Sequence, residues 1–182
     1  KSPLFGLLLA GGRSTRMGRD KASMVIGADG LNQGQRAVQG LLPVCQKVFL
    51  SLRDGQTAPE GCEHLEIVRD NPSISGPLAG ILAAFEREPD AAWLVMACDL
   101  PFVAPEVLTK LFSAEEGADF IAYASATDGL PEPLCAIYEP GSRAVLKRHA
   151  DRNHLCPRHI MVEEHVTLLE LPPSCRRALE NM

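Results

Sequence analysis

Short, almost continuous apolar runs alternate along the chain with longer amphipathic stretches. The runs are bounded by Gly, Pro, Asp or Asn, which is typical of strands that are buried on both faces. They predict strands at Leu4–Ala10, Val48–Leu52, Leu65–Val68, Ala92–Ala97, Phe120–Ala124, Leu134–Tyr138 and Val166–Leu171. The stretches between them predict helices at Gln33–Leu42, Ala79–Glu86, Pro105–Phe112 and Arg143–His149.

This alternation predicts an α/β fold in which helices cover both faces of a mostly parallel sheet. The 182 residues, 46% of them apolar, contain no repeat or linker, so we expect one domain over residues 1–182. Ligands of such sheets bind beyond the carboxyl ends of the strands. The segments after Ala10, Leu52, Val68 and Ala97 are therefore where we expect a site.

Charge and composition narrow the choice of ligand. The chain has 18 Lys and Arg against 23 Asp and Glu, a formal charge of −5, and only 5% aromatic residues. This balance argues against nucleic-acid binding and against binding to an anionic membrane. No apolar run approaches the length of a bilayer span, and we interpret residues 1–12 as a first strand and its turn rather than a signal peptide.

The six cysteines contain no Cys-x-x-Cys pair, and several lie within apolar runs. Reduced cysteines in the core of a cytoplasmic protein have this distribution, whereas a disulfide framework is the weaker alternative. We therefore predict a cytoplasmic location.

The loop that follows the first predicted strand carries the clearest chemical signal. Gly11 and Gly12 allow the backbone to approach a ligand closely, because neither has a Cβ. Four cations follow within nine residues of an otherwise acidic chain: Arg13, Arg16, Arg19 and Lys21. This combination indicates a small polyanion such as a nucleoside triphosphate. The loop is neither a P-loop nor the dinucleotide fingerprint. A glycine-rich turn with solvated arginines is the alternative.

Leu9 to Ala22 matches at every fixed position the Leu-Ala-Gly-Gly-x-Ser-x-Arg-Met-Gly-x-Asp-Lys-Ala pattern of the molybdenum cofactor guanylyltransferases, which the chain resembles. Three later segments are also similar to that family: Gly76–Ile81, Ala97–Phe102 and Pro131–Leu134. The resemblance implies a Rossmann-like three-layer α/β/α sandwich with one late antiparallel strand, for which Leu134–Tyr138 is the candidate.

The resemblance also implies an activity. A member of this family transfers GMP from GTP to the terminal phosphate of molybdopterin, giving molybdopterin guanine dinucleotide and pyrophosphate. GTP and molybdopterin are then substrates, Mg²⁺ is the cofactor, and other cofactor-assembly proteins are transient partners. Two alternatives stay open: a relative that uses CTP or acts on a sugar phosphate, and a non-catalytic nucleotide-binding module. Gly11-Gly12 favours GTP, since the cytidylyl relatives usually have Ala-Gly there.

Asp99 is the expected Mg²⁺ ligand, because it follows a buried strand and its carboxylate is a hard oxygen donor. A turn-forming Asp before Pro101 is the alternative. We expect catalytic roles for Arg16, Lys21 and Asp99, with Arg16 and Lys21 stabilising charge on the triphosphate. The expected nucleotide-binding residues are Leu9, Ala10, Gly11, Gly12, Lys21, Ser51, Asp70, Gly80 and Asp99.

Two of these positions carry their own alternatives. Asp70 either contacts the nucleotide or metal, as the resemblance implies, or forms an Asx turn with the residues that follow it. Ser51 stands where the family often has Asn. It can still donate and accept hydrogen bonds, although with a shorter reach toward guanine.

Histidines and a cysteine gather near the end of the chain. Cys156 and His159 have zinc-ligand spacing, but no second tight pair accompanies them, so we interpret this segment as a loop around Pro157. The nearby cations Lys147, Arg148, Arg152 and Arg158 are candidates for facing the pterin phosphate. At Asn181-Met182 we expect the chain to stop just short of the family's closing Asn-x-Asn-Thr-Pro.

Overall fold

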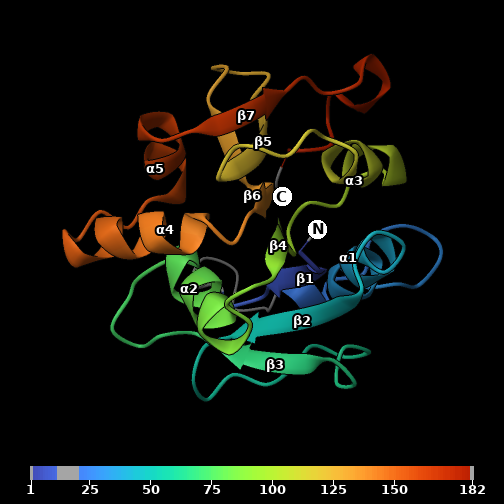
Figure 1. Cartoon of the computed structure of the whole chain (residues 1–182). Coiled ribbons are helices and arrows are strands. Elements are labelled where there is room, and N and C mark those ends of the chain that lie inside the picture. The colour runs from blue at the N-terminus through green and yellow to red at the C-terminus, as the bar shows by residue number, and fades with distance from the viewer. Residues whose placement is uncertain (1, 12–20, 181–182) are drawn as a thin grey trace.

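The computed structural model describes residues 2–11 and 21–180. In this part of the chain, seven strands form one sheet in the order β3-β2-β1-β4-β6-β5-β7 (Figure 1). The strands are β1 (Leu4–Leu9), β2 (Lys47–Leu52), β3 (Glu66–Arg69), β4 (Ala92–Ala97), β5 (Phe120–Ala124), β6 (Pro131–Tyr138) and β7 (Val166–Leu169).

Helices cover both faces of the sheet, as predicted (Figure 1). They are α1 (Gln33–Leu41), α2 (Pro77–Arg87), α3 (Pro105–Phe112), α4 (Ser142–Asp151) and α5 (Pro157–Glu163), with short 3₁₀ turns η1 (Lys21–Ser23) and η2 (Pro173–Cys175). Helices α1 and α3 pack on one face, and α2, α4 and α5 pack on the other. Successive residues of β4 face opposite layers. Leu94 belongs to the core beneath α1 and α3, whereas Trp93 and Val95 belong to the core beneath α2, α4 and α5. The three-layer sandwich is confirmed.

The strand directions also agree with the prediction. β1 is parallel to both β2 and β4, β3 is parallel to β2, and β7 is parallel to β5. β6 runs antiparallel to both of its neighbours, β4 and β5, and it contains the segment predicted as the late antiparallel strand. The chain passes from β1 outward through β2 to β3 and then returns to β4 on the other side of β1. Ligands of doubly wound sheets bind at such a reversal.

One helix was missed, and several elements begin or end one to three residues from their predicted bounds. Helix α5 is a correction, because Pro157 begins a helix instead of lying in a loop. Proline suits this first position, where the missing N–H would have had no helical partner. Helix α2 begins at Pro77, two residues before the predicted start, with Gly76 as its N-cap at a φ of 75° that glycine adopts readily.

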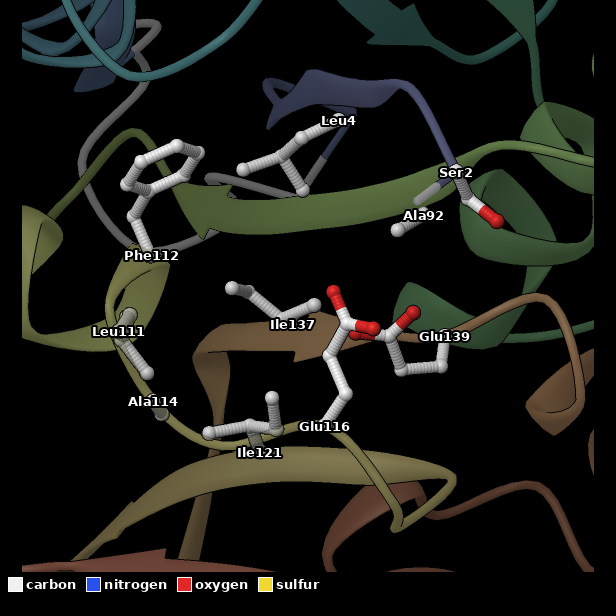
Figure 2. A pocket seen from close by; sticks show the side chains of 10 residues that line it. All are labelled: Ser2, Leu4, Ala92, Leu111, Phe112, Ala114, Glu116, Ile121, Ile137 and Glu139. Atoms are coloured by element: carbon white, nitrogen blue, oxygen red, sulfur yellow. The ribbon is translucent and has the colours of Figure 1, made fainter.

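A cavity of about 20 Å³ lies between α3 and the sheet, lined mainly by apolar side chains such as Leu4, Leu111 and Ile137 (Figure 2). It has room for about one water molecule. Ser2 and Ala92 place it near the amino ends of β1 and β4, away from the carboxyl edge where ligands bind.

All six cysteines lie in the described part of the chain, and none of them is in a disulfide: Cys45, Cys62, Cys98, Cys135, Cys156 and Cys175. None of the helices in the described part of the chain has the length and apolar character that a bilayer-spanning segment needs.

Candidate active site

A cleft of about 830 Å³ opens at the carboxyl edge of the sheet, where β1, β2, β3 and β4 end. This volume lies within the usual range for small-molecule sites. The cleft combines backbone from tight turns with a few charged side chains. Its lining residues are Leu9, Ala10, Gly11, Ser51, Arg53, Asp54, Asp70, Asn71, Pro72, Ile74, Ser75, Gly76, Pro77, Ala79, Ala97, Cys98, Asp99 and Leu134.

One wall of the cleft is held by a hydrogen bond between the ends of β2 and β3. The Ser51 hydroxyl donates to Oδ1 of Asp70 over 2.5 Å, and Ser51 is only 1% exposed. The backbone N–H of Asp70 also donates to the carbonyl of Leu52, at 2.9 Å. Backbone and side chain together therefore fix the position of the Asp70 carboxylate.

Two glycines allow the chain to close around this carboxylate. A Cβ on Gly80, in the first turns of α2, would lie 2.2 Å from the Ser51 Oγ and 3.0 Å from Oδ1 of Asp70. A Cβ on Gly11, which follows β1, would lie 2.8 Å from Oδ2 of Asp70. The separations of 2.2 and 2.8 Å are shorter than van der Waals contact allows. Glycine is thus required at both positions for this packing.

The turn after β3 leads directly into α2. The side chain of Asn71, not that of Asp70, makes the Asx turn, since its Oδ1 accepts from the backbone N–H of Ser73 at 2.9 Å. Gly76 and Pro77 then start α2 at the cleft. The amino end of a helix carries a partial positive charge, so it favours an anion. Pro77 itself has no N–H, and the N–H of Ala79 donates to the Gly76 carbonyl at 3.2 Å.

A second network fixes the loop after β2. The Gln56 side chain donates to the carbonyl of Ala10 at 2.7 Å, and its Oε1 accepts from the N–H of Arg53 at 3.1 Å. The Arg69 guanidinium donates to the carbonyls of Arg53 and Gln56 at 2.9 and 2.7 Å. Backbone on both sides of the cleft is thereby tied together, while Arg53 itself adds a cation to the lining.

Asp99 lies in the turn that follows β4 and lines the same cleft as Asp70, half-buried like it. Carboxylate oxygens are hard donors, and Mg²⁺ typically takes one or two of them along with phosphate oxygens and water. The donor set of the cleft therefore fits Mg²⁺.

Most of the residues expected from the sequence meet at this cleft. Leu9, Ala10, Gly11, Ser51, Asp70 and Asp99 line it, and Gly80 packs against the Ser51–Asp70 pair. Gly12 and Arg16, with Arg13 and Arg19, lie outside the described residues. Lys21 begins η1, and its side chain also lies outside the described part. The sequence analysis did not predict the roles of Gln56 and Arg69. Gln56 follows β2 and Arg69 ends β3, so both lie at the carboxyl edge of the sheet.

Two of the four cations near the end of the chain have acidic partners. Arg148 pairs with Glu164, and Arg158 pairs with Asp128 and Glu132 at 3.3 and 2.8 Å. None of Lys147, Arg148, Arg152 and Arg158 is among the residues that line the cleft in the described structure. A role for them toward the pterin phosphate stays a prediction.

An open, mostly parallel sheet with carboxylates and a helix amino end at its strand-order reversal is the architecture of nucleotide-handling α/β proteins. Residues 6–167 match the family model described as MobA-like NTP transferase domain. The chain therefore belongs to this family of nucleotidyltransferases.

Named relatives agree with this family assignment. The chain is 36% identical over 153 residues to a probable molybdenum cofactor guanylyltransferase of Pelotomaculum thermopropionicum, covering 83% of this chain and 70% of that protein. It is also 36% identical over 163 residues to a molybdenum cofactor biosynthesis bifunctional protein of Synechocystis sp., covering 88% of this chain but only 46% of that protein. The chain thus spans about half of the bifunctional relative. The resemblance stated from the motifs is confirmed.

A solved structure shares the fold. The molybdopterin-guanine dinucleotide biosynthesis protein A of Archaeoglobus fulgidus superimposes with a TM-score of 0.71 at 24% identity, covering 91% of this chain and 83% of that one.

Proposed function

We propose that this chain transfers GMP from GTP to the terminal phosphate of molybdopterin, releasing pyrophosphate. The observation that carries the proposal is the coincidence of two features. The complete guanylyltransferase-like motif from Leu9 to Ala22 begins at the carboxyl end of β1, and that end lines a cleft with Asp70 and Asp99. The names of the relatives support the same substrates.

In this reaction the attacking group is a phosphate oxygen, which is already ionised near neutral pH. The step needs positioning and charge neutralisation more than a strong general base. The described lining of the cleft agrees with this requirement, since it contains carboxylates and an arginine but no histidine.

Each part of the cleft then has a role in holding the triphosphate. Gly11 lets the backbone come close to the phosphates, and the partial positive charge at the amino end of α2 favours them. Asp99, with Asp70 beside the same cleft, would hold Mg²⁺, which neutralises phosphate charge when bound. Arg16 and Lys21 are proposed to stabilise the charge that builds up on the departing pyrophosphate.

Ser51 takes a positioning role in this proposal. Its hydroxyl donates to Asp70, so only its lone pairs remain for a nucleotide. The selection of guanine over other bases is therefore assigned to the cleft as a whole rather than to this one side chain.

The biological setting completes the proposal. We place the protein in the cytoplasm, with GTP and molybdopterin as substrates and with transient contacts to other cofactor-assembly proteins. Residues 1–182 act as one nucleotidyltransferase domain.

Pyrophosphate release with GTP, CTP and ATP, each with and without the pterin, tests this proposal. We expect GTP with pterin to be preferred by at least about tenfold in kcat/KM, or roughly 1.4 kcal/mol. Release without pterin is the background control. Equal turnover of CTP and GTP would replace guanylyl transfer with a broader transferase activity. GTP binding without any pyrophosphate release would instead indicate a binding module.

A further inference from the structure

Two histidines and a glutamate meet outside the cleft, where α4 ends and α5 returns. His149 is in the last turn of α4, His154 follows that helix, and Glu163 ends α5. Within residues 2–11 and 21–180 they are the one group of three or more His, Cys, Asp or Glu side chains whose donor atoms all lie within 4.8 Å of one another. None of the three lines the cleft.

The backbone at the end of α4 brings the two imidazoles together. Asn153 adopts a left-handed conformation with φ of 59°, and the N–H of His154 donates to the carbonyl of His149 at 2.9 Å. The N–H of Asn153 donates to the carbonyl of Ala150, also at 2.9 Å. These two bonds form a Schellman motif, which turns the chain back over the helix. The two rings consequently stack, 5.5 Å apart between centroids and 9° from parallel.

The three donor atoms face a common point. Nδ1 of His149 lies 3.3 Å from Nδ1 of His154, and the two nitrogens lie 4.0 and 3.8 Å from Oε2 of Glu163. Ligands bonded to a tetrahedral Zn²⁺ at about 2.0–2.2 Å are roughly 3.3–3.6 Å from each other. The side chains of His154 and Glu163 are each 52% exposed, so they are free to close the remaining few tenths of an ångström.

A carboxylate behind the cluster prepares His149 as a ligand. Nε2 of this ring lies 2.7 Å from Oε1 of Glu164, and an ionised carboxylate only accepts hydrogen bonds. Nε2 is therefore the donor in this contact, and in the neutral ring Nδ1 keeps a lone pair on the side of His154 and Glu163. A carboxylate that orients a metal-bound histidine in this way is a common feature of zinc sites. Glu164 is itself held by Arg148.

We propose that His149, His154 and Glu163 form a site for a divalent transition-metal ion, Zn²⁺ in particular, that joins the end of α4 to the end of α5. Two imidazole nitrogens and one carboxylate oxygen leave a fourth position for water. The alternative for the same geometry is a hydrogen-bonded histidine pair that takes up no metal.

Calorimetric titration of the metal-free chain with Zn²⁺, and visible absorption with Co²⁺, test the proposal. We expect one ion per chain, a four-coordinate Co²⁺ spectrum without thiolate charge-transfer bands, and a higher Tm with Zn²⁺. His154→Ala and Glu163→Gln should each weaken binding by at least about tenfold, since loss even of an outer partner has that effect in known sites. Both side chains are half exposed, so the variants should fold.

The matched controls are His159→Ala and Glu170→Gln, which change an exposed histidine and an exposed carboxylate outside the cluster. They should bind Zn²⁺ like the unaltered chain. Zn²⁺ affinity unchanged in His154→Ala would overturn the proposal, as would thiolate bands that place Cys156 on the ion. A chain that takes up no Co²⁺ or Zn²⁺ would leave the histidine pair as the correct interpretation.

Discussion

Ser51 lies in β2 and Asp70 follows the neighbouring parallel strand β3, and the two share a 2.5 Å hydrogen bond at the wall of the cleft. The bond is shielded from water, because Ser51 is almost completely buried. Gly11 and Gly80 close on it from two other elements. The position of the Asp70 carboxylate is thus set by four segments of the chain before any ligand binds.

Ser51→Ala should loosen this carboxylate without changing the charge of the cleft. Removing a hydrogen bond to a charged group costs about 1.5–3 kcal/mol, so we expect GTP affinity in the presence of Mg²⁺ to fall roughly tenfold or more. Isothermal titration with GTP measures the change. A double-mutant cycle with Asp70→Asn isolates the coupling between the two residues. Additive effects in that cycle would mean that Ser51 acts independently of Asp70.

Gly80→Ala should disturb the same pair sterically. The added Cβ would lie 2.2 Å from the Ser51 Oγ, so either that side chain or α2 must move. We expect GTP binding to weaken, and overpacking to cost about 1–3 kcal/mol of stability, more than the helix gains from alanine. Gly40→Ala in α1 is the control, because its Cβ would meet only Leu108, at an ordinary 3.4 Å. If the two variants bind GTP equally well, close packing around Asp70 is not needed.

Substitutions of Asp99 and of Lys21 should impair the reaction in different ways. Asp99→Asn keeps the shape but removes the charge that attracts a cation, so the Mg²⁺ concentration for half-maximal rate should rise and turnover should fall strongly. Mn²⁺, which also favours oxygen ligands, should restore part of the rate. Lys21→Ala should weaken GTP binding by about 1.5–3 kcal/mol whether or not metal is present.

A Mg²⁺ titration at saturating GTP, run on the unaltered chain and both variants, separates these outcomes. An unchanged Mg²⁺ midpoint and maximal rate in Asp99→Asn would make Asp99 a turn residue. The metal would then be held elsewhere, with Asp70 the next candidate.

The cysteine thiols should differ sharply in reactivity. Burial raises the pKa of the Cys45 and Cys135 thiols to about 12, so very little thiolate forms at neutral pH and reagents have no access. Cys156 is exposed. Maleimide labelling followed by peptide mass spectrometry should modify Cys156 in the folded chain, and Cys45 and Cys135 only after unfolding. Rapid labelling of Cys135 under native conditions would contradict the packing of β6 against the core.

The fold was predictable because its central strands are continuous runs of apolar residues. Ala92–Ala97 is buried along its whole length, and a continuous apolar run marks such a strand without ambiguity. Helix α5 was missed because it is short and starts with Pro157. A proline is common both in the first turn of a helix and in a loop, so a single sequence does not distinguish the two.

The candidate site was predictable only in part, for a similar reason. The rule that ligands bind at carboxyl ends of strands located Ser51, Asp70 and Asp99. It could not show that Ser51 donates to Asp70, since 18 residues separate them and only the pairing of β2 with β3 makes them neighbours. The cluster of His149, His154 and Glu163 was hidden likewise, because a left-handed turn at Asn153 determines which histidines meet.

The antiparallel direction of β6 has a consequence for how this protein can change over evolution. Strands that run in the same direction need a crossover connection, such as helix α2 between β3 and β4, and an insertion there must preserve the packing of that helix on the sheet. β5 and β6 are joined instead by a short turn in which Ser125 and Leu130 are hydrogen-bonded. This turn projects from the ligand edge, and β6 brings Leu134 into the lining of the cleft. Residues can be gained or lost at this turn without altering the register of β6 against β4, so we expect the border of the cleft beside Leu134 to accept changes in loop length while the carboxyl ends of β1 to β4 keep their spacing.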